Sequence, residues 1–290
     1  MATTLAGPNG SVVIGAGYPV VLINDQLRIM DQTPKIYDEL SAGKMDSILA
    51  LADWGRNVGL DMVDILINHP GLDEVDLLPR IAHYIDKEIG CPISLDTRNP
   101  QALEAALKEI SPSKALINSV TAEKDTLEVL LPIAKKYGAA LVGMPIGHIY
   151  GLPRTAEGRV VEARVILDTA EAAGIPRQDI VLDAICLASS AEPDTFQVTI
   201  ETLRRFHQEL DSATILGIGN AGFGMPEAVY VDLAYLIGSV PSGLDAAIVN
   251  PATPGLIETV RAIEFLTGRD PSGRGYIKNY RAKKKAGKTL

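Results

Sequence analysis

Asn and Asp side chains stand at the ends of most of the short apolar runs in this sequence. A carboxylate accepts two hydrogen bonds from an N–H or NH2 edge, whereas a side-chain amide both donates and accepts. The run ends carry no Lys or Arg, the side chains that bind phosphate or carboxylate groups. The pattern therefore favours a neutral, planar heterocycle with several N–H and C=O groups as the ligand. The run ends are Asn24-Asp25, Asn68-His69, Asp96-Thr97, Asn118-Ser119, Met144-Pro145, Asp183, Gly219-Asn220 and Asn250.

Residues that carry other chemistries are not grouped along the chain. The four His lie far apart, at positions 69, 83, 148 and 207, whereas a catalytic metal usually has clustered His or Glu ligands. Cys91 and Cys186 have no second Cys nearby, so no zinc site is expected. No Ser–His or Cys–His arrangement for nucleophilic catalysis stands out. We therefore expect no metal in the site.

Each polar run end also has a structural alternative, because Asn and Asp cap helices and make local turns. Asp96 stands shortly before the helix predicted to start near Pro100 and would serve as its cap. Asn220 is flanked by glycines, which allow a ligand to approach the backbone closely. Met144 and Cys186 are residue types that more often pack than react.

The apolar runs alternate with amphipathic stretches in a regular order. Because the runs are continuously apolar, they are typical of parallel strands covered on both faces. Eight strand–helix units in a chain of this length predict a single-domain α/β fold, a (β/α)8 TIM barrel. A doubly wound open sheet is the alternative, but it would normally carry a glycine-rich loop where this sequence has VLINDQLRIM. The predicted strands are 20–24, 62–67, 91–96, 115–119, 139–144, 179–184, 213–218 and 246–250, and the predicted helices are 44–59, 73–89, 100–110, 123–137, 155–173, 193–210, 226–238 and 254–266.

Composition limits the partners and the compartment. The chain has 290 residues, is 47% hydrophobic and has a net charge of −9, which argues against nucleic acid as the main partner. It has no apolar stretch long enough to predict a membrane span, no signal peptide and only two Cys, so we expect a cytoplasmic protein. Residues 1–268 are predicted to form the barrel. Residues 269–290 hold eight Lys or Arg and one Asp, and we expect a solvated basic tail, with docking to an acidic partner as the alternative.

Four motifs at successive strand ends resemble the pterin-binding barrel family. They are SLDT ending at Thr97, INSVT starting at Ile117, the strand end at Asp183 and the GIGN loop at Asn220. Within the family they are most similar to the methyltetrahydrofolate:corrinoid-protein methyltransferases, as is the segment GLPRTAEGRV at 151–160. The resemblance extends over roughly residues 20 to 266.

This resemblance implies both an activity and its residues. Asp96, Asn118 and Asp183 would bind the pterin ring of tetrahydrofolate or methyltetrahydrofolate, and Gly143 and Met144 at the fifth strand end complete the expected binding set. Asn220 would lie near N5 and strengthen its hydrogen bond as the C–N bond breaks, which stabilises the transition state. Asp183 would belong to the network that delivers the proton.

The same resemblance implies the partners. The methyl group would move between N5 and the cobalt of a corrinoid (cobalamin) carried by a separate protein, in a direction that the sequence leaves open. A homodimer is also implied. The alternative is a dihydropteroate synthase-like enzyme, which relies on a Lys after strand 7 and a base at strand 8 to bind pyrophosphate. Here those positions read GNAGFGM and VNPATPG, without a basic residue.

Overall fold

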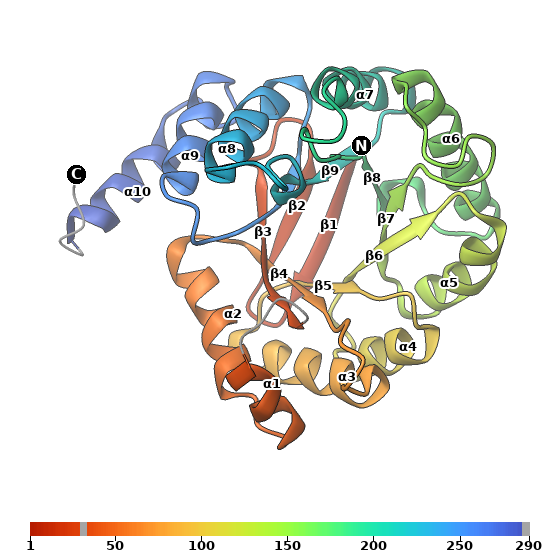
Figure 1. The fold of residues 1–290 in the computed structure, drawn as a ribbon, viewed down its shortest axis with the longest axis vertical. Coiled ribbons are helices and arrows are strands. Elements are labelled where there is room, and N and C mark those ends of the chain that lie inside the picture. The colour runs from red at the N-terminus through yellow and green to blue at the C-terminus, as the bar shows by residue number, and fades with distance from the viewer. Residues whose placement is uncertain (30–33, 286–290) are drawn as a thin grey trace.

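Eight parallel strands close into a barrel surrounded by helices (Figure 1). The structure is a computed structural model that describes residues 1–29 and 34–285. Each strand pairs with its neighbours along the chain, and the last pairs with the first, so the described sheet has no free edge. The strands are β3 (Val21–Arg28), β4 (Met62–Leu66), β5 (Ile93–Asp96), β6 (Leu116–Thr121), β7 (Ala140–Met144), β8 (Ile180–Asp183), β9 (Ala213–Gly217) and β10 (Ala246–Val249).

Helices follow the strands and cover the outside of the barrel. Several begin with a side-chain cap: Asp73 accepts a hydrogen bond from the backbone N–H of Val75, and Asn99 accepts one from that of Gln101. The helix at Lys124–Tyr137 ends at Gly138, which has a left-handed backbone conformation. The helices are α1 (Pro34–Ser41), α2 (Asp46–Val58), α3 (Glu74–Tyr84, continued by a π-helical turn at Ile85–Ile89), α4 (Pro100–Glu109), α5 (Lys124–Tyr137), α6 (Ala156–Ala172), α7 (Thr195–Leu210), α8 (Ala228–Ser239), α9 (Leu256–Leu266) and α10 (Arg274–Lys285).

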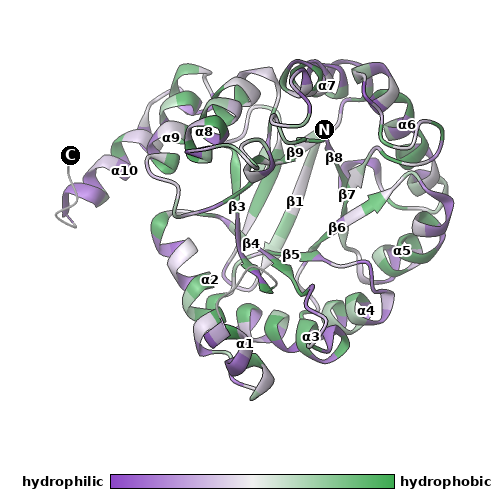
Figure 2. Ribbon diagram, in the orientation of Figure 1, coloured by the Kyte–Doolittle hydropathy of each residue, from purple (hydrophilic) through white to green (hydrophobic). Residues whose placement is uncertain are grey.

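The alternation of side chains along the strands creates two apolar cores. Outward-facing residues such as Leu22, Ile65 and Leu182 pack against the helices, whereas Ile23, Met62 and others fill the barrel interior. Strands are mostly hydrophobic, and hydrophilic residues gather on the outer sides of the helices (Figure 2). Both faces of each strand are therefore covered, which is why the strands read as continuous apolar runs.

An N-terminal hairpin that the sequence analysis did not predict closes one end of the barrel. Its strands are β1 (Ala2–Gly7) and β2 (Gly10–Gly15), and they lie across the barrel centre in Figure 1. Leu5 and Ile14 are fully buried and belong to the interior core with Val21. The turn residues Pro8 and Asn9 between two apolar stretches were the signal for this hairpin.

The predicted single-domain TIM barrel is confirmed, and the open-sheet alternative is wrong. All eight predicted strands and all eight predicted helices are present, with ends shifted by a few residues. The first strand continues to Arg28, past the predicted end at Asn24, because a bulge between Asn24 and Leu27 keeps it paired with β4. Helix α1 was not predicted. Among the described residues, none of the helices has both the length and the apolarity needed to cross a bilayer.

Part of the expected basic tail is a helix. Residues Arg274–Lys285 form α10, which packs against α9. The carboxylate of Asp270 accepts hydrogen bonds from the backbone N–H groups of Arg274, Gly275 and Tyr276, and so caps the helix. Lys283 forms an ion pair with Glu258 of α9. Residues 286–290 of the expected tail lie outside the described residues.

Candidate functional site

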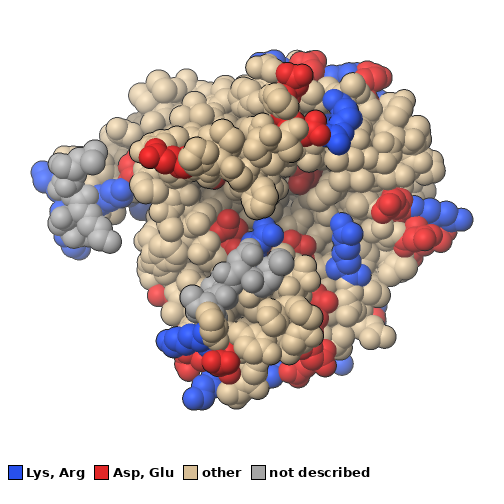
Figure 3. All heavy atoms as spheres, viewed as in Figure 1, with Lys and Arg blue, Asp and Glu red and all other residues tan. Residues whose placement is uncertain are grey.

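The carboxyl ends of the barrel strands meet at one open end, the mouth. Figure 3 shows this face, where acidic side chains border a central hollow. Residues on alternate positions of each strand point inward, as Met62, Leu116, Val142 and Val181 do in the interior core. The residues two positions further along the same strands therefore also point inward. They are Asp64, Asn118, Met144 and Asp183. A polar layer therefore caps the apolar interior at the mouth.

Asp64, Asp96 and Asn118 form one cluster on three neighbouring strands. Asp96 and Asn118 are register partners on β5 and β6, and Asp64 on β4 pairs with Ser94, two residues deeper than Asp96. The Nδ2 of Asn118 donates a hydrogen bond to Oδ1 of Asp64 over 3.2 Å. This contact passes across β5, as expected where alternate strands of a barrel contribute to one layer. A bulge in β6 between Ile117 and Val120 lies at Asn118.

Burial raises the pKa of both carboxyl groups in this cluster. Asp64 is 2% exposed, and desolvation is the main cause of its raised pKa, which the hydroxyl of Ser94 and the amide of Asn118 oppose. Desolvation also raises the pKa of Asp96, and the nearby charge of Asp64 raises it further. The positive charge of Arg28 acts in the opposite direction on both groups. The two carboxyls therefore compete for a proton above the ordinary titration range of Asp.

Asp183 is held at the end of β8 by the turn that follows it. Its Oδ1 accepts a hydrogen bond from the backbone N–H of Ile185 over 2.7 Å. Ile185 has a φ of 61°, a strained value for a β-branched residue. Arg159 of α6, 1% exposed, stabilises this turn by donating to the carbonyl oxygens of Ala184 at 2.6 Å and Ile185 at 3.0 Å. Burial raises the pKa of Asp183 to about 6, although Arg159 lowers it in part.

Asn220 lies in the loop after β9, at the rim of the mouth. It ends a single 3-10 turn, Ile218–Asn220, and its side chain is exposed. A Cβ on Gly217 would come within 3.1 Å of its Nδ2, so glycine at 217 makes room for the amide. At this position the amide could contact a ligand in the mouth from the solvent side.

The two residues expected at the fifth strand end point in opposite directions. Met144 faces the mouth and is half-buried. A Cβ on Gly143 would lie 3.1 Å from both Ile166 of α6 and Leu182 of β8, so Gly143 faces outward, into the helix layer. Its expected contact with a ligand is therefore limited to its backbone.

Some polar strand ends have local structural roles. The Nδ2 of Asn24 donates to the carbonyl oxygen of Leu51 in α2, outside the barrel. Asn250 is exposed, and its Oδ1 accepts from the backbone N–H of Ala252. Asp96, in contrast, does not cap α4, because Asn99 does so. Of the expected strand ends, the polar residues Asp96, Asn118 and Asp183 face inward together with the apolar Met144.

The expectation that strand ends carry no basic residue is wrong. The extended β3 ends at Arg28, and Arg98 follows β5. Arg28 pairs with Leu66 of β4, which pairs with Asp96, and both positive charges lower the pKa of Asp96. The bulge in β3 causes this placement, because it lets the strand continue to Arg28. A strand that ended at Asn24, as predicted, would not bring Arg28 to the site.

Two inward or buried residues escaped the sequence analysis. Asp64 lies inside the apolar run MVDIL, and the only signal was a charged residue in the middle of a predicted buried strand. Arg159 lies within α6, where a single Arg in a helix usually reads as a surface residue. Among the described residues no group of three or more His, Cys, Asp or Glu is arranged to hold a metal ion.

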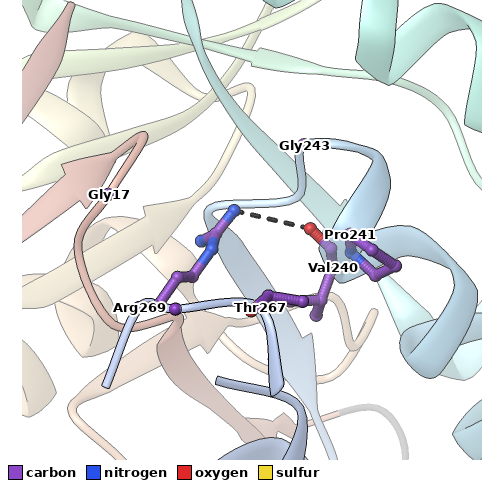
Figure 4. A pocket seen from close by; sticks show the side chains of 7 residues that line it. Gly17, Val240, Pro241, Gly243, Thr267 and Arg269 are labelled. Atoms are coloured by element: carbon purple, nitrogen blue, oxygen red, sulfur yellow. Dashed lines mark hydrogen bonds between the residues drawn. The ribbon is translucent and has the colours of Figure 1, made fainter. Parts of the chain in front are cut away.

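A second depression opens at the opposite end of the barrel, near the amino ends of β3 and β10 (Figure 4). There the Nη2 of Arg269 donates to the carbonyl oxygen of Val240 and lies 3.3 Å from the buried carboxylate of Asp245. Nε2 of His207 lies 3.1 Å from the same carboxylate. Asp245 thereby links α7 and the segment between α9 and α10 to the barrel. The lining residues are Gly17, Val240, Pro241, Gly243, Thr267, Gly268 and Arg269.

Solved structures with the same architecture include dihydropteroate synthases. One from Yersinia pestis has a TM-score of 0.71 at 14% identity, covering 92% of this chain and 99% of that one. One from Thermus thermophilus has a TM-score of 0.64 at 22% identity, covering 91% and 97%. At such identities the likeness shows the barrel fold alone.

Sequence relatives include methyl-transferring enzymes. The chain is 24% identical over 228 residues to the methylcorrinoid:tetrahydrofolate methyltransferase of Eubacterium limosum, covering 77% of this chain and 83% of that protein. It is 25% identical over 205 residues to methionine synthase of Mycobacterium tuberculosis, covering 66% of this chain and 17% of that protein. The model of the pterin binding enzyme family matches residues 29–250, most of the chain. Because this family model matches most of the chain, including the inward-facing Asp96, Asn118 and Asp183, the chain belongs to the family of pterin-binding enzymes.

Proposed function

We propose that this protein transfers a methyl group between N5 of tetrahydrofolate and the cobalt of a corrinoid carried by a partner protein. The observation that carries the proposal is the inward cluster of Asp96, Asn118 and Asp183 beneath an exposed Asn220 at one barrel mouth. The similarity to the Eubacterium limosum methyltransferase supports it.

The cluster matches a flat ring that has N–H and NH2 donors on its edges. Asp96 and Asp183 each offer carboxylate oxygens that accept from N–H or NH2 groups, and a buried charged acceptor makes such bonds strong. Asn118 adds an amide oxygen, because its Nδ2 is already bound to Asp64. The half-buried Met144 provides an apolar contact beside the ring.

Methyl transfer from N5 is a displacement at the methyl carbon. The reduced cobalt supplies the electron pair of the new bond, while the pair of the broken C–N bond stays on N5 and takes up a proton. Asn220 donates a hydrogen bond that strengthens as charge develops on N5, which lowers the barrier. Asp183, with a pKa raised to about 6, belongs to the network that supplies or accepts that proton. The reverse reaction uses the same residues.

The rim of the mouth fits a protein partner. The loop before α6 exposes Ile149 and Tyr150, and the loop before α8 exposes Met225 and Phe223, which is 74% exposed. Exposed apolar side chains on strand-to-helix loops are typical of interaction surfaces. A corrinoid carried on such a partner would then face the ring bound below.

The test mixes purified protein, methyltetrahydrofolate and free cob(I)alamin and follows the absorbance of the cobalt species. Loss of the cob(I)alamin spectrum with formation of methylcobalamin, dependent on the protein, is the expected result. A protein that binds methyltetrahydrofolate but leaves the spectrum unchanged, with both free cobalamin and a corrinoid protein, would contradict methyl transfer.

The second candidate is a pyrophosphate-displacing reaction like that of dihydropteroate synthase. Arg28 and Arg98 near Asp96 favour it, because pyrophosphate needs basic partners. The loops at 218–227 and 250–255 contain no Lys or Arg, which argues against it. Release of pyrophosphate from a pterin pyrophosphate substrate distinguishes the two reactions.

A homodimer and a cytoplasmic location belong to the same proposal. The free, buried Cys91 and Cys186 are compatible with a reducing compartment. Light scattering of the purified protein measures its mass in solution, and a monomer at micromolar concentration would contradict the dimer.

A further inference from the structure

Asp64 is a buried carboxylate that the proposed chemistry does not use. It is 2% exposed and lies in the barrel interior, deeper than Asp96 on the neighbouring strand. A charged side chain is rarely buried without a partner, since desolvation is costly. Its hydrogen bond from Asn118 and the nearby Arg28 offset that cost.

The orientation of the Asn118 amide follows from this contact. An ionised carboxylate accepts hydrogen bonds and cannot donate them, so only the NH2 end of the amide can face Asp64. The carbonyl oxygen Oδ1 is then available to the ligand. If Asp64 held a proton, it could donate to Oδ1, and the amide would turn its NH2 end toward the ligand instead.

We propose that Asp64 is a positioning residue that orients the Asn118 amide, so that Asn118 presents an acceptor to the N–H edge of the ring. The inference rests on the proposed function for the identity of the ring, tetrahydrofolate. It also makes the site selective: a ring with an acceptor at that edge would meet Oδ1 and be rejected.

Asp64 has a second effect on the site, through its charge. Asp96 must be ionised to accept from the ring, and the negative charge of Asp64 makes that ionisation harder. The groups that act on this pair are Asp25 and Arg28 from β3, Glu74 from α3 and Arg98 after β5. Removing the charge of Asp64 therefore lets Asp96 ionise at lower pH.

The test measures the affinity of Asp64→Asn for tetrahydrofolate by calorimetry between pH 6 and 9. In the unaltered protein, affinity rises as pH rises through the titration of Asp96 and then levels off. In Asp64→Asn the plateau affinity falls about tenfold, because a neutral amide orients Asn118 less strongly, and the midpoint moves to lower pH. The matched control is Asp61→Asn. Asp61 is half-buried, directly precedes β4 at the end away from the mouth, and accepts a hydrogen bond from the backbone N–H of Leu22.

Two outcomes overturn the inference. One is an unchanged plateau in Asp64→Asn, whether or not the midpoint moves, and the other is an equal loss of affinity in Asp61→Asn, which would indicate a general effect of replacing a carboxylate near this strand. The fall of the plateau relative to the Asp61→Asn control is the readout of the orientation of Asn118, because the lost charge of Asp64 alone moves only the midpoint.

A ligand-free measurement separates this inference from the proposed function. In the 15N spectrum of the free protein, the side-chain NH2 of Asn118 is expected to exchange slowly and to shift as Asp64 titrates. In Asp64→Asn the side-chain NH2 of Asn118 should exchange faster, and its pH-dependent shift should disappear. If the protein binds no tetrahydrofolate but shows this behaviour, the proposed function fails and the role of Asp64 stands. An Asn118 NH2 that is unaffected by Asp64→Asn overturns the role of Asp64.

Discussion

Single residues in the mouth combine negative charge with burial, and they therefore take up protons at higher pH than an ordinary Asp does. Asp64, Asp96 and Asp183 all have a pKa raised mainly by desolvation. Such groups are expensive for stability, because the unfolded chain ionises them more readily than the folded protein does. The presence of several such groups at one end of a barrel is typical of a functional site, where stability is exchanged for reactivity.

Asn220→Ala tests the group assigned to N5. Methyl transfer should slow by about 10- to 1000-fold, as when a preorganised hydrogen-bond donor is removed, while the affinity for tetrahydrofolate changes little. Stopped-flow absorbance gives the rate, and calorimetry gives the affinity. A wild-type rate in the variant would remove Asn220 from the mechanism.

Asp183→Asn tests the effect of its burial on stability. The folded protein holds a proton on Asp183 up to about pH 6, whereas the unfolded chain loses it near the ordinary value of 3.8. The unfolded state thus binds fewer protons in this window, so the contribution of Asp183 to stability falls as pH rises through it. We expect the change in the free energy of unfolding caused by Asp183→Asn to be more stabilising at pH 8 than at pH 5, by on the order of 1 kcal/mol. Urea unfolding at both pH values measures this, and an equal effect at both would contradict it.

Secondary-structure elements hold the mouth loops through buried charged groups that bind the backbone. Arg159 of α6 fixes the turn after β8, and Glu162 of the same helix fixes the loop that precedes it. The carboxylate of Glu162, fully buried, accepts from the backbone N–H groups of His148, Ile149 and Tyr150. One helix thereby positions both a site carboxylate and an exposed part of the rim.

Glu162→Gln tests this support of the loop. One carboxylate oxygen becomes an NH2 group that cannot accept from the backbone, so at least one partly buried N–H loses its partner. We expect a loss of about 1–3 kcal/mol in the free energy of unfolding and faster hydrogen exchange at residues 148–150. The control is Glu157→Gln on the same helix, where the exposed side chain pairs with Arg205. Equal changes in both variants would show that the loop does not depend on Glu162.

The whole molecule divides stability and chemistry between the two ends of the barrel. The hairpin β1–β2 fills the amino-terminal end with Leu5 and Ile14, and the polar cluster occupies the mouth. Between them the interior is apolar, with Ile23, Val142 and Ile215 among its residues. A change in the hairpin should therefore alter stability without altering the ligand site.

Leu5→Ala tests this division. Truncating a fully buried Leu should lower the free energy of unfolding by about 2–5 kcal/mol, through lost transfer energy and a residual cavity. Tetrahydrofolate affinity of the folded variant should stay at the wild-type value. Thr4→Ala, an exposed neighbour on the same strand, is the control for denaturation and calorimetry. A loss of affinity in a variant that remains folded would contradict the separation of the two ends.

Periodicity was sufficient to predict the barrel from the sequence, and strand-end residues were sufficient to select much of the candidate site. Parallel strands buried on both faces must be apolar throughout, so the alternation with helices could be recognised residue by residue. Because active sites form at the carboxyl ends of barrel strands, Asp96, Asn118 and Asp183 could be selected before any coordinates were known. Their inward orientation follows from the two-residue period of the strands.

Tertiary structure alone decided which other side chains reach the mouth. The bulge after Asn24 shifts β3 by a residue and carries Arg28 beside Asp96, and neither the bulge nor the contact has a signal in local composition. Asp64 meets Asn118 across an intervening strand, and Arg159 crosses from a helix to the turn after β8. These contacts join residues far apart in the chain, and their energies depend on distance and burial, which exist only once the barrel has closed.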